Sequence, residues 1–367
     1  MDTWATSSLS PELACGWLHD EDLFERTYPM DLRPQGQDII RTWLFSTVVR
    51  ANLEFGALPW QHAGISGWIL DPDHKKMSKS KGNVVTPMGL LEKYGSDAVR
   101  YWAASARLGL DATFDEAQMK IGRRLAIKVL NASKFALTMG GENTALDLDP
   151  ARISLELDRS VIAELRRVIS VASDALVAYD HSRALEVTES FFWTFCDDYL
   201  ELVKERAYNR DGKWAEEEAV SARTVLAIVI DTVIRLLAPF LPYVTEEVWS
   251  WYRPGSIHRA PWPTLEGLED VAGDPEVLRA ASAALIALRR VKSEAKVSPR
   301  TPFLKVSLEV PQASKAAIEG VLADLSAASK VEGPFELVSY EAAEDGEAET
   351  RVVSFELGEA PAKRKKA

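Results

Sequence analysis

The stretch that most constrains the fold runs from residue 155 to residue 251, where apolar residues recur at three- and four-residue spacing. This spacing places apolar side chains on one face of an α-helix. Turn-forming residues interrupt it at Asp180-His181, at 209–212 and at Pro239. Helices joined by short turns pack as bundles, so we predict a bundle of four or five helices. Its expected members lie near 155–180, 182–209, 216–237 and 241–252.

Composition indicates a globular protein that works in a reducing compartment. The 367 residues, 47% of them hydrophobic and 27% charged, leave room for two or three domains with their own cores. Cys15 and Cys196 lie far apart, without Cys or His neighbours at ligand spacing, which argues against a disulfide framework or a structural metal site. No signal peptide is recognisable and no apolar run is long enough to span a membrane. We therefore expect a cytoplasmic protein without membrane contact.

A short basic run stands out because the net charge of the chain is -12. Four lysines and no acidic residue occur from His74 to Leu91, and the run contains the string 76–80, Lys-Met-Ser-Lys-Ser, followed by Gly82-Asn83. Ammonium groups bind phosphate oxygens as point charges, while hydroxyls and loop amides donate hydrogen bonds. The run therefore favours a phosphate-binding loop. A solvated surface loop is the alternative.

The string 76–80 is identical to the KMSKS signature of class I aminoacyl-tRNA synthetases, and its flanks, KKMSKSKGNVVTPMGLLEKYGSDAVRYW, resemble that family well beyond the pentamer. The resemblance implies that the loop closes on the triphosphate of ATP, which Mg²⁺ accompanies, and stabilises the pyrophosphate leaving group during amino-acid adenylation. It implies a catalytic role for Lys79 as the principal phosphate contact, with Lys76 assisting. The ATP contacts that it implies within the loop are Met77, Ser78, Lys79 and Ser80.

A second motif, RPQGQDIIRTWLF, spans residues 33–45. A strand that ends at a Gly-x-Asp turn and runs into a helix presents ligand-binding residues at the carboxyl edge of a parallel sheet. The string resembles the adenosine-binding strand of the valyl and isoleucyl enzymes, which implies that Gly36, Gln37 and Asp38 contact ATP. A plain helix N-cap at Asp38 is the alternative. His62, in a later predicted strand, is either a further ATP contact or a core histidine.

Two tryptophans are candidates for the amino-acid pocket. The opening DTWATSSLSP resembles the segment that follows the inserted editing domain of the family, and Trp43 lies five residues after Asp38, as in the relatives. The resemblance implies that Trp4 and Trp43 form two walls of a small apolar pocket. Such a pocket separates side chains that differ by a methylene by only about 1–3 kcal/mol. Two buried core tryptophans are the alternative.

A basic helix is predicted after residue 116, because no acidic residue occurs from Ala117 to Gly141. Lys120, Arg124 and Lys128 recur every four residues and so lie along one helical face. Such a face suits contacts to the backbone of tRNA, which position the nucleic acid without reading its sequence. A solvated face is the alternative.

The predicted fold is α/β and then mainly α: the C-terminal half of a Rossmann-like class I catalytic domain with stem helices, an anticodon-binding helix bundle, and a small C-terminal mixed α/β unit. That unit combines helices near 275–296 and 312–329 with strands at 303–310, 335–340 and 350–357. The expected domains are residues 1–116 with the signature loop and stem, 117–265 for the anticodon-binding part, 266–358 for the small unit, and 359–367 for a basic disordered tail.

Further strings, at 191–201, 236–249 and 256–263, resemble the anticodon-binding domain of the valyl, isoleucyl and leucyl enzymes. The wording as a whole is most similar to the valyl members, which implies activation of valine and its transfer to tRNA(Val). The HIGH motif and the editing domain of the family do not occur in this sequence. We therefore expect the isolated chain to adenylate valine poorly or not at all. A tRNA-binding fragment, half of a split enzyme whose partner chain carries HIGH, and an isoleucyl-type enzyme are the alternatives.

Overall fold

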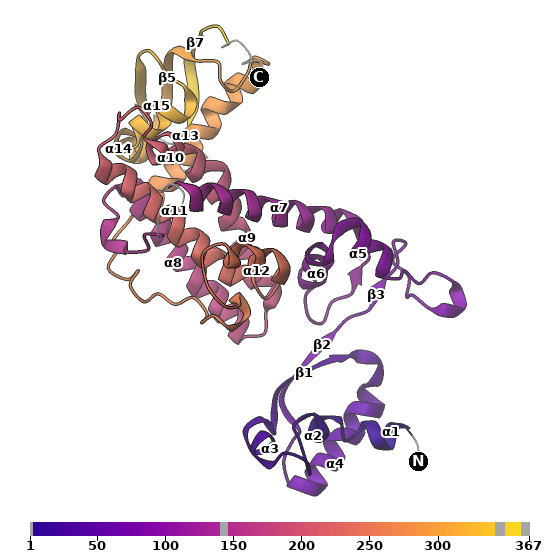
Figure 1. Cartoon of the computed structure of the whole chain (residues 1–367). Coiled ribbons are helices and arrows are strands. Elements are labelled where there is room, and N and C mark those ends of the chain that lie inside the picture. The colour runs from indigo at the N-terminus through magenta and orange to yellow at the C-terminus, as the bar shows by residue number, and fades with distance from the viewer. Residues whose placement is uncertain (1–2, 140–145, 342–348, 361–367) are drawn as a thin grey trace. The chain divides into compact units, whose positions relative to one another are not determined.

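A computed structural model describes residues 3–139, 146–341 and 349–360 of the chain (Figure 1). The chain divides into two compact units, residues 1–123 with 175–183, and residues 124–174 with 184–367. No helix in the described ranges combines the length and the apolar character needed to cross a membrane. The predicted fold class is confirmed: an α/β part comes first, and a mainly helical part with a small sheet follows.

The first unit is built around a parallel strand pair, which the described residues show as a two-stranded sheet. The helices α1 (Thr3–Ser7), α2 (Ser10–Ala14) and α3 (Glu21–Thr27) precede strand β1 (Met30–Gly36). A crossover made of η1 (Gln37–Ile39), the π-helical turn η2 (Ile40–Leu44) and helix α4 (Phe45–Phe55) leads to β2 (Trp60–Ser66). Gly36 lies opposite Ser66, so both strands end at the same edge. The predicted strand with a helical turn after Gly-x-Asp is confirmed.

The remainder of this unit carries the lysine loop and the stem. Strand β3 (Ile69–Leu70) pairs in parallel with β4 (Ala112–Thr113), and η3 (Lys79–Lys81) lies in the loop. Helices α5 (Met88–Tyr94) and α6 (Ser96–Ala104), the stem helices expected from the sequence, are separated at Gly95. Helix α7 (Glu116–Thr138) approaches α6 closely at Gly122, where an added Cβ would lie 2.6 Å from the Tyr101 Cβ. The glycine is therefore required by helix packing.

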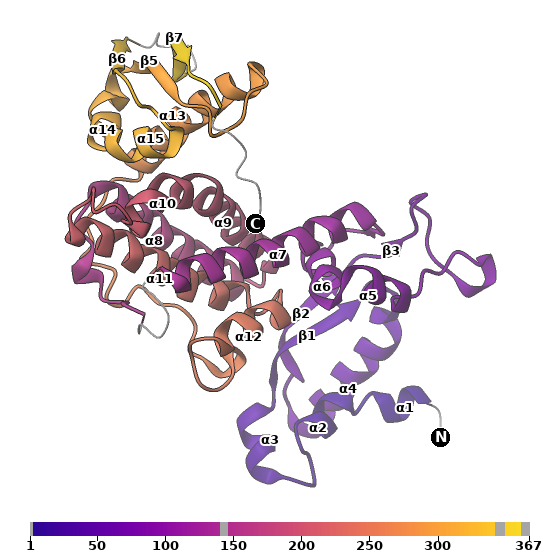
Figure 2. The ribbon, with the colours of Figure 1, turned by 45° about the horizontal axis from the view of Figure 1, so that its top comes forward.

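The predicted bundle is confirmed in the second unit, where Figure 2 shows α8, α10 and α11 side by side. After η4 (Pro150–Arg152) the helices are α8 (Glu156–Val177), α9 (His181–Thr194), α10 (Leu200–Tyr208), α11 (Glu216–Leu237) and α12 (Pro242–Ser250). The segment expected as one helix over 182–209 contains a π-helical turn, η5 (Phe195–Tyr199), between α9 and α10. Helix α11 is buried around most of its circumference, because apolar residues occupy nearly all its faces.

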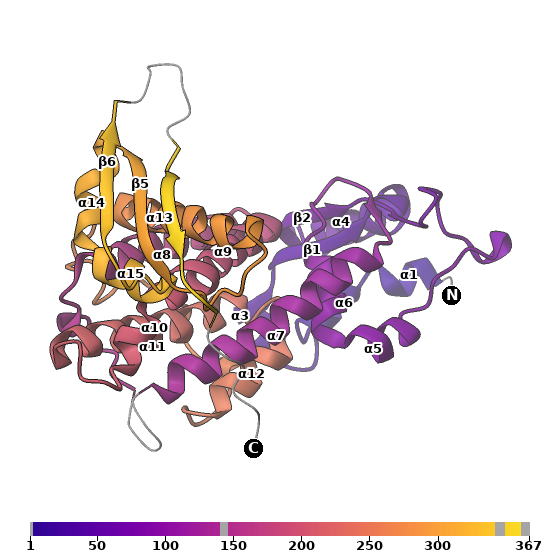
Figure 3. The same cartoon turned by 90° about the horizontal axis from the view of Figure 1, so that it is seen from above.

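After η6 (Ile257–Arg259), helix α13 (Pro275–Glu294) leads into the small C-terminal sheet, whose strands lie in the order β6-β5-β7 (Figure 3). Strand β5 (Phe303–Pro311) pairs in parallel with β6 (Phe335–Tyr340) and antiparallel with β7 (Arg351–Leu357). The single helix expected over 312–329 is wrong. The structure shows η7 (Gln312–Ser314), α14 (Lys315–Gly320) and α15 (Leu322–Ser329), because the backbone leaves the helical region at Val321. Of the predicted basic tail, 361–367 lies outside the described residues.

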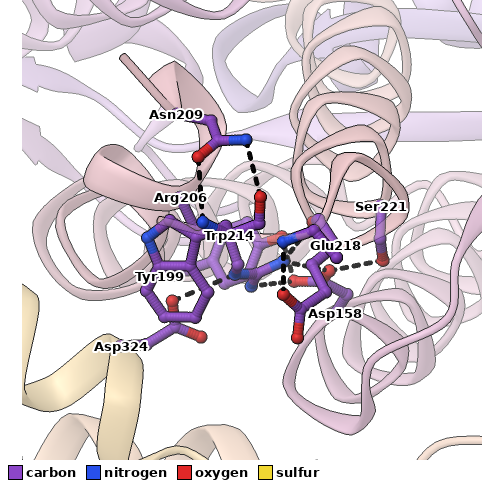
Figure 4. Close-up of polar contacts among 9 residues, drawn as sticks. Asp158, Tyr199, Arg206, Asn209, Trp214, Glu218, Ser221 and Asp324 are labelled. Carbon is purple, nitrogen blue, oxygen red and sulfur yellow. Dashed lines mark hydrogen bonds and ion pairs between the residues drawn. The ribbon is translucent and has the colours of Figure 1, made fainter. Parts of the chain in front are cut away.

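A buried ionic cluster joins α15 to the bundle (Figure 4). The guanidinium of Arg206 on α10 donates two hydrogen bonds of 2.8 Å to the Asp158 carboxylate of α8 and one of 3.0 Å to Asp324 of α15. Asp158 also accepts hydrogen bonds from the hydroxyls of Tyr199, at 2.8 Å, and Ser221, at 2.5 Å. The side chains of Arg206 and Asp158 have no exposed surface. One buried cation therefore faces two buried carboxyl groups.

Candidate adenylation site

The lysine loop begins and ends at a hydrogen-bonded base formed by Asp71 and Asn83. One Asp71 oxygen accepts the backbone N–H groups of Asp73, at 3.0 Å, and Lys75, at 2.8 Å. The other accepts the Asn83 amide at 2.7 Å, and the Asn83 oxygen accepts the Ser78 N–H at 2.9 Å. The Lys75 N–H and the Asn83 amide hold the pKa of Asp71 below its ordinary value. The Asp71 carboxylate therefore stays charged, and it accepts three hydrogen bonds: two from backbone N–H groups and one from the Asn83 amide.

The sequence alone places Gly82-Asn83 directly after the lysine string but does not predict that Asn83 pairs with Asp71. Asp71 is 6% exposed, and 12 positions separate it from Asn83. An Asp that opens a turn before a basic loop and an Asn that closes it are a signal for such a base, because Asp and Asn readily bond the backbone of their own turns.

Lys76 and Asp38, two residues predicted from different motifs, come together at the carboxyl edge of β1 and β2. The Lys76 Nζ lies 3.4 Å from the Asp38 Oδ1, although 38 positions separate the two residues. The same ammonium lies 3.2 Å from the centre of the Trp68 ring. Asp38 follows β1 and Trp68 follows β2, so the convergence arises from the parallel pairing of the strands.

The other predicted residues of the loop are only partly described. Met77 and Ser78 are partly buried, and the Ser78 Oγ lies 3.2 Å from the Oγ of the exposed Ser80. Lys79 opens the 3₁₀ turn η3, but its side chain lies outside the described part of the structure. Its predicted phosphate contact therefore stays a prediction.

Gly36 and Gln37 are exposed beside Asp38, at the end of β1. The backbone of Gly36 is extended, with φ -81° and ψ 151°, and a Cβ added there would meet no atom within 4 Å. The protein itself therefore does not require glycine at this position. The predicted close approach of a nucleotide to the backbone is the remaining reason for glycine at position 36.

The two candidate pocket tryptophans have different environments. Trp43 is buried, and its ring stacks on that of Trp60, with centroids 5.9 Å apart and 9° between the planes. Its Nε1 donates to the Ser7 carbonyl, the last residue of α1, at 2.8 Å, and the Arg33 guanidinium lies 4.0 Å from its ring centre. Trp4 on α1 is 46% exposed. The structure thus joins Trp43 to the helix that carries Trp4, and their role in a pocket stays a prediction.

The structure does not bring His62 to the pair of Lys76 and Asp38. His62 lies in β2, four residues before Ser66, which places it about 13 Å from the carboxyl end of the strand at the usual rise per residue. Its ring centre is 5.0 Å from that of Tyr179. The predicted ATP contact of His62 stays a prediction.

The three predicted cations of α7 differ in how they are engaged. Lys120 is exposed. The Lys128 Nζ pairs with the Asp197 carboxylate at 2.7 Å, and it lies 5.7 Å from the Trp193 ring centre. The Arg124 guanidinium lies 5.4 Å from the same ring. A phosphate at Lys128 would therefore compete with a carboxylate already in place. Within the ranges that the structure describes, no group of three or more His, Cys, Asp or Glu side chains could hold a metal ion.

Two family models match this chain: "tRNA synthetases class I (I, L, M and V)" over residues 1–115 and "Anticodon-binding domain of tRNA ligase" over residues 158–308. The chain belongs to the class I aminoacyl-tRNA synthetases. The first model covers the parallel strand pair with the Lys76–Asp38 contact, and the second covers the helix bundle and β5 up to Leu308. The family predicted from the motifs is therefore confirmed.

Among the class I synthetases, valine–tRNA ligases match over most or all of this chain. The enzyme of Thermobifida fusca is 60% identical, and the match covers 90% of this chain and 37% of that enzyme. The enzyme of Bifidobacterium longum is 54% identical, and the match covers 100% of this chain and 43% of that enzyme. That of Cutibacterium acnes is 51% identical over 100% of this chain and 40% of its own. The chain thus spans about two fifths of the length of these relatives, and its predicted likeness to valyl-tRNA synthetases is confirmed.

Two solved structures of other synthetases share the fold. The ternary complex of LeuRS, tRNA and LeuAMS from Agrobacterium radiobacter K84 has a TM-score of 0.59 at 20% identity, covering 85% of this chain and 36% of its own. Mycobacterium tuberculosis methionyl-tRNA synthetase, solved with methionyl-adenylate, has a TM-score of 0.53 at 23% identity, covering 67% of this chain and 48% of its own.

Proposed function

We propose that this chain forms the lysine-loop side of the adenylation site and the tRNA-binding part of a valine–tRNA ligase. The observation that carries the proposal is the 3.4 Å approach of Lys76 to Asp38 at the carboxyl edge of the parallel strands. A carboxylate suited to ribose hydroxyls and an ammonium suited to phosphates lie side by side there, as binding of a nucleotide requires. The valine–tRNA ligase relatives support valine and tRNA(Val) as substrates.

In the proposed reaction the valine carboxylate attacks the α-phosphorus of ATP, and the bond to pyrophosphate breaks. Lys76 and Lys79 attract the charge that builds up on the leaving phosphates, while Asp38, with Gly36 and Gln37, holds the adenosine. Mg²⁺ enters with ATP as part of the substrate. The valyl group then passes to the terminal adenosine of tRNA(Val).

The helical part serves tRNA in this proposal. Lys120, Arg124 and Lys128 on α7 contact phosphates of the tRNA backbone, and the bundle α8–α12 receives the anticodon arm. We retain the division into domains of residues 1–116, 117–265, 266–358 and 359–367 as part of the proposal. We also propose that the protein works in the cytoplasm, where its tRNA substrate is aminoacylated.

Two assays test the proposal. Electrophoretic mobility shift of tRNA(Val), compared with tRNA(Ile), measures binding, and we expect tRNA(Val) to bind more tightly. Valine-dependent exchange of labelled pyrophosphate into ATP is measured for the chain alone, with tRNA, and with the HIGH-containing region of a relative added as a separate chain. We expect exchange in the supplemented reaction and less in the chain alone, because the transition state needs donors on all sides.

Lys79→Ala is the control for the exchange assay, because it removes the predicted phosphate contact. Exchange by the chain alone above this control would show that one side of the site suffices. Exchange with isoleucine in place of valine would contradict the assignment to valine. The absence of both tRNA binding and exchange in the supplemented reaction would overturn the proposal.

A further inference from the structure

Trp68, which the chemistry above does not use, lies directly beneath the Lys76 ammonium. The Lys76 Nζ is 3.2 Å from the centre of the indole ring and 3.4 Å from the Asp38 Oδ1. A cation over the face of tryptophan is attracted by the ring quadrupole, and tryptophan is the strongest of the aromatic partners. The ammonium therefore has two simultaneous partners, an anion and an aromatic face.

The indole is held by a rigid backbone. The Trp68 N–H donates to the Asp111 carboxylate at 2.7 Å, and the Trp68 carbonyl accepts the Ala112 N–H at 2.8 Å. The preceding residue, Gly67, packs so closely on the Leu110 carbonyl that any Cβ would overlap it. The link between β2 and β3 is thus fixed on both sides of the indole.

The backbone of Lys76 is fixed as well. Lys76 forms an isolated antiparallel bridge with Leu70, and its carbonyl accepts the Asn83 amide at 3.3 Å. Lys76 therefore belongs to the anchored base of the loop, whereas η3 (Lys79–Lys81) lies beyond it. With both backbones held, the contact between the ammonium and the indole face is set by the fold.

We propose that Trp68 is a positioning residue of the nucleotide site, whose indole face holds the Lys76 ammonium while its anionic partner changes from the Asp38 carboxylate to a nucleotide phosphate. This inference rests on the proposed function. The side chains of Lys76 and Asp38 are 55% and 49% exposed, and ion pairs at such exposure are weak, so an arriving nucleotide can replace the carboxylate. The indole face attracts the ammonium before and after that exchange. Without the indole, the Lys76 side chain released from Asp38 would sample many rotamers in solvent.

The first test measures binding of Mg²⁺-ATP to the full chain by isothermal titration calorimetry. Trp68→Leu should weaken binding about two- to fivefold, the range of a cation–π contact at an exposed site, and Trp68→Phe should restore part of the loss. In the Lys76→Met background, Trp68→Leu should have no further effect, because the ammonium that it positions is gone. An equal loss in both backgrounds would show that Trp68 acts only on the local structure and would overturn the proposal.

The second test reads the contact without nucleotide. The acetylation rate of Lys76 is measured by mass spectrometry against that of Lys75, whose ammonium pairs with Asp73 at 3.7 Å. Trp68→Leu should raise the ratio of the Lys76 rate to the Lys75 rate, because the Lys76 ammonium, no longer covered by the indole, is more accessible to the reagent. An unchanged ratio would overturn the proposal. If the wild-type chain binds no ATP while the ratio rises, the nucleotide site of the proposed function fails and the contact stands.

Discussion

Replacing Asp158 by alanine should destabilise the helical unit far more than replacing Asp324 by asparagine, although both carboxyl groups bond the same guanidinium. Arg206 and Asp158 have no exposed side-chain surface and share two hydrogen bonds of 2.8 Å. Removing one partner of a buried ion pair costs about 3–5 kcal/mol, because the other charge stays buried without compensation. Asp158→Ala also leaves the hydroxyls of Tyr199 and Ser221 without their acceptor. We expect a loss of about 4 kcal/mol or more, a large fraction of a domain's stability.

The environment of Asp324 predicts that, unlike removal of Asp158, removal of the Asp324 charge does not destabilise the folded protein. Burial, together with the charge of Asp158, raises the pKa of Asp324 to about 6, despite the attraction of Arg206. A carboxyl whose pKa is raised on folding takes up protons as the protein folds, so its ionised form opposes folding at pH 7. An asparagine keeps an oxygen for the Arg206 Nε and removes the excess negative charge. We expect Asp324→Asn to leave stability unchanged or to raise it by up to about 3 kcal/mol at pH 7.

Urea denaturation followed by far-ultraviolet circular dichroism measures both variants. The sign of the pH dependence is a further check: as pH falls from 7 towards 5, Asp324 becomes protonated in the folded protein, so wild type should gain stability relative to Asp324→Asn. Equal destabilisation by the two substitutions would refute the reasoning that the cluster carries one negative charge too many. A wild type that loses stability relative to Asp324→Asn as pH falls from 7 towards 5 would refute it as well.

Three other outcomes are expected. Asn83→Asp sets a second carboxylate against Asp71 at the base of the lysine loop, so trypsin should cleave at residues 79–81 faster than in wild type; an unchanged rate would mean that the base does not order the loop. Gly122→Ala should lower the free energy of unfolding by about 1–3 kcal/mol in thermal denaturation, because the new Cβ would lie 2.6 Å from the tyrosine of α6; no loss would show that the helices separate freely. If α7 binds phosphates, Lys120→Ala should reduce the slope of log binding constant against log salt concentration for tRNA by about one unit. Lys128→Ala should reduce this slope less, because Lys128 already has a carboxylate partner. Equal slopes for the two variants would contradict this ranking.

Local pattern predicted most of the elements in this chain. Three- and four-residue spacing located the bundle helices, and the Gly-x-Asp turn located the end of β1. The prediction failed at 312–329, where a helical composition is divided at Val321. It also missed the π-helical turn η5 within the segment 182–209, because one inserted residue per turn hardly alters an apolar pattern.

The sequence by itself determined the family, the identity of the lysine loop and the helical character of the larger unit, because motif wording and short-range periodicity are properties of neighbouring residues. Only the tertiary structure decided which charges meet. Arg206, 48 positions from Asp158 and 118 from Asp324, reads in a helical pattern as an ordinary surface cation. Its burial, like the meeting of Lys76 with Asp38 and Trp68, follows from which elements pack together. Packing brings distant residues into contact and removes the water that would otherwise solvate their charges.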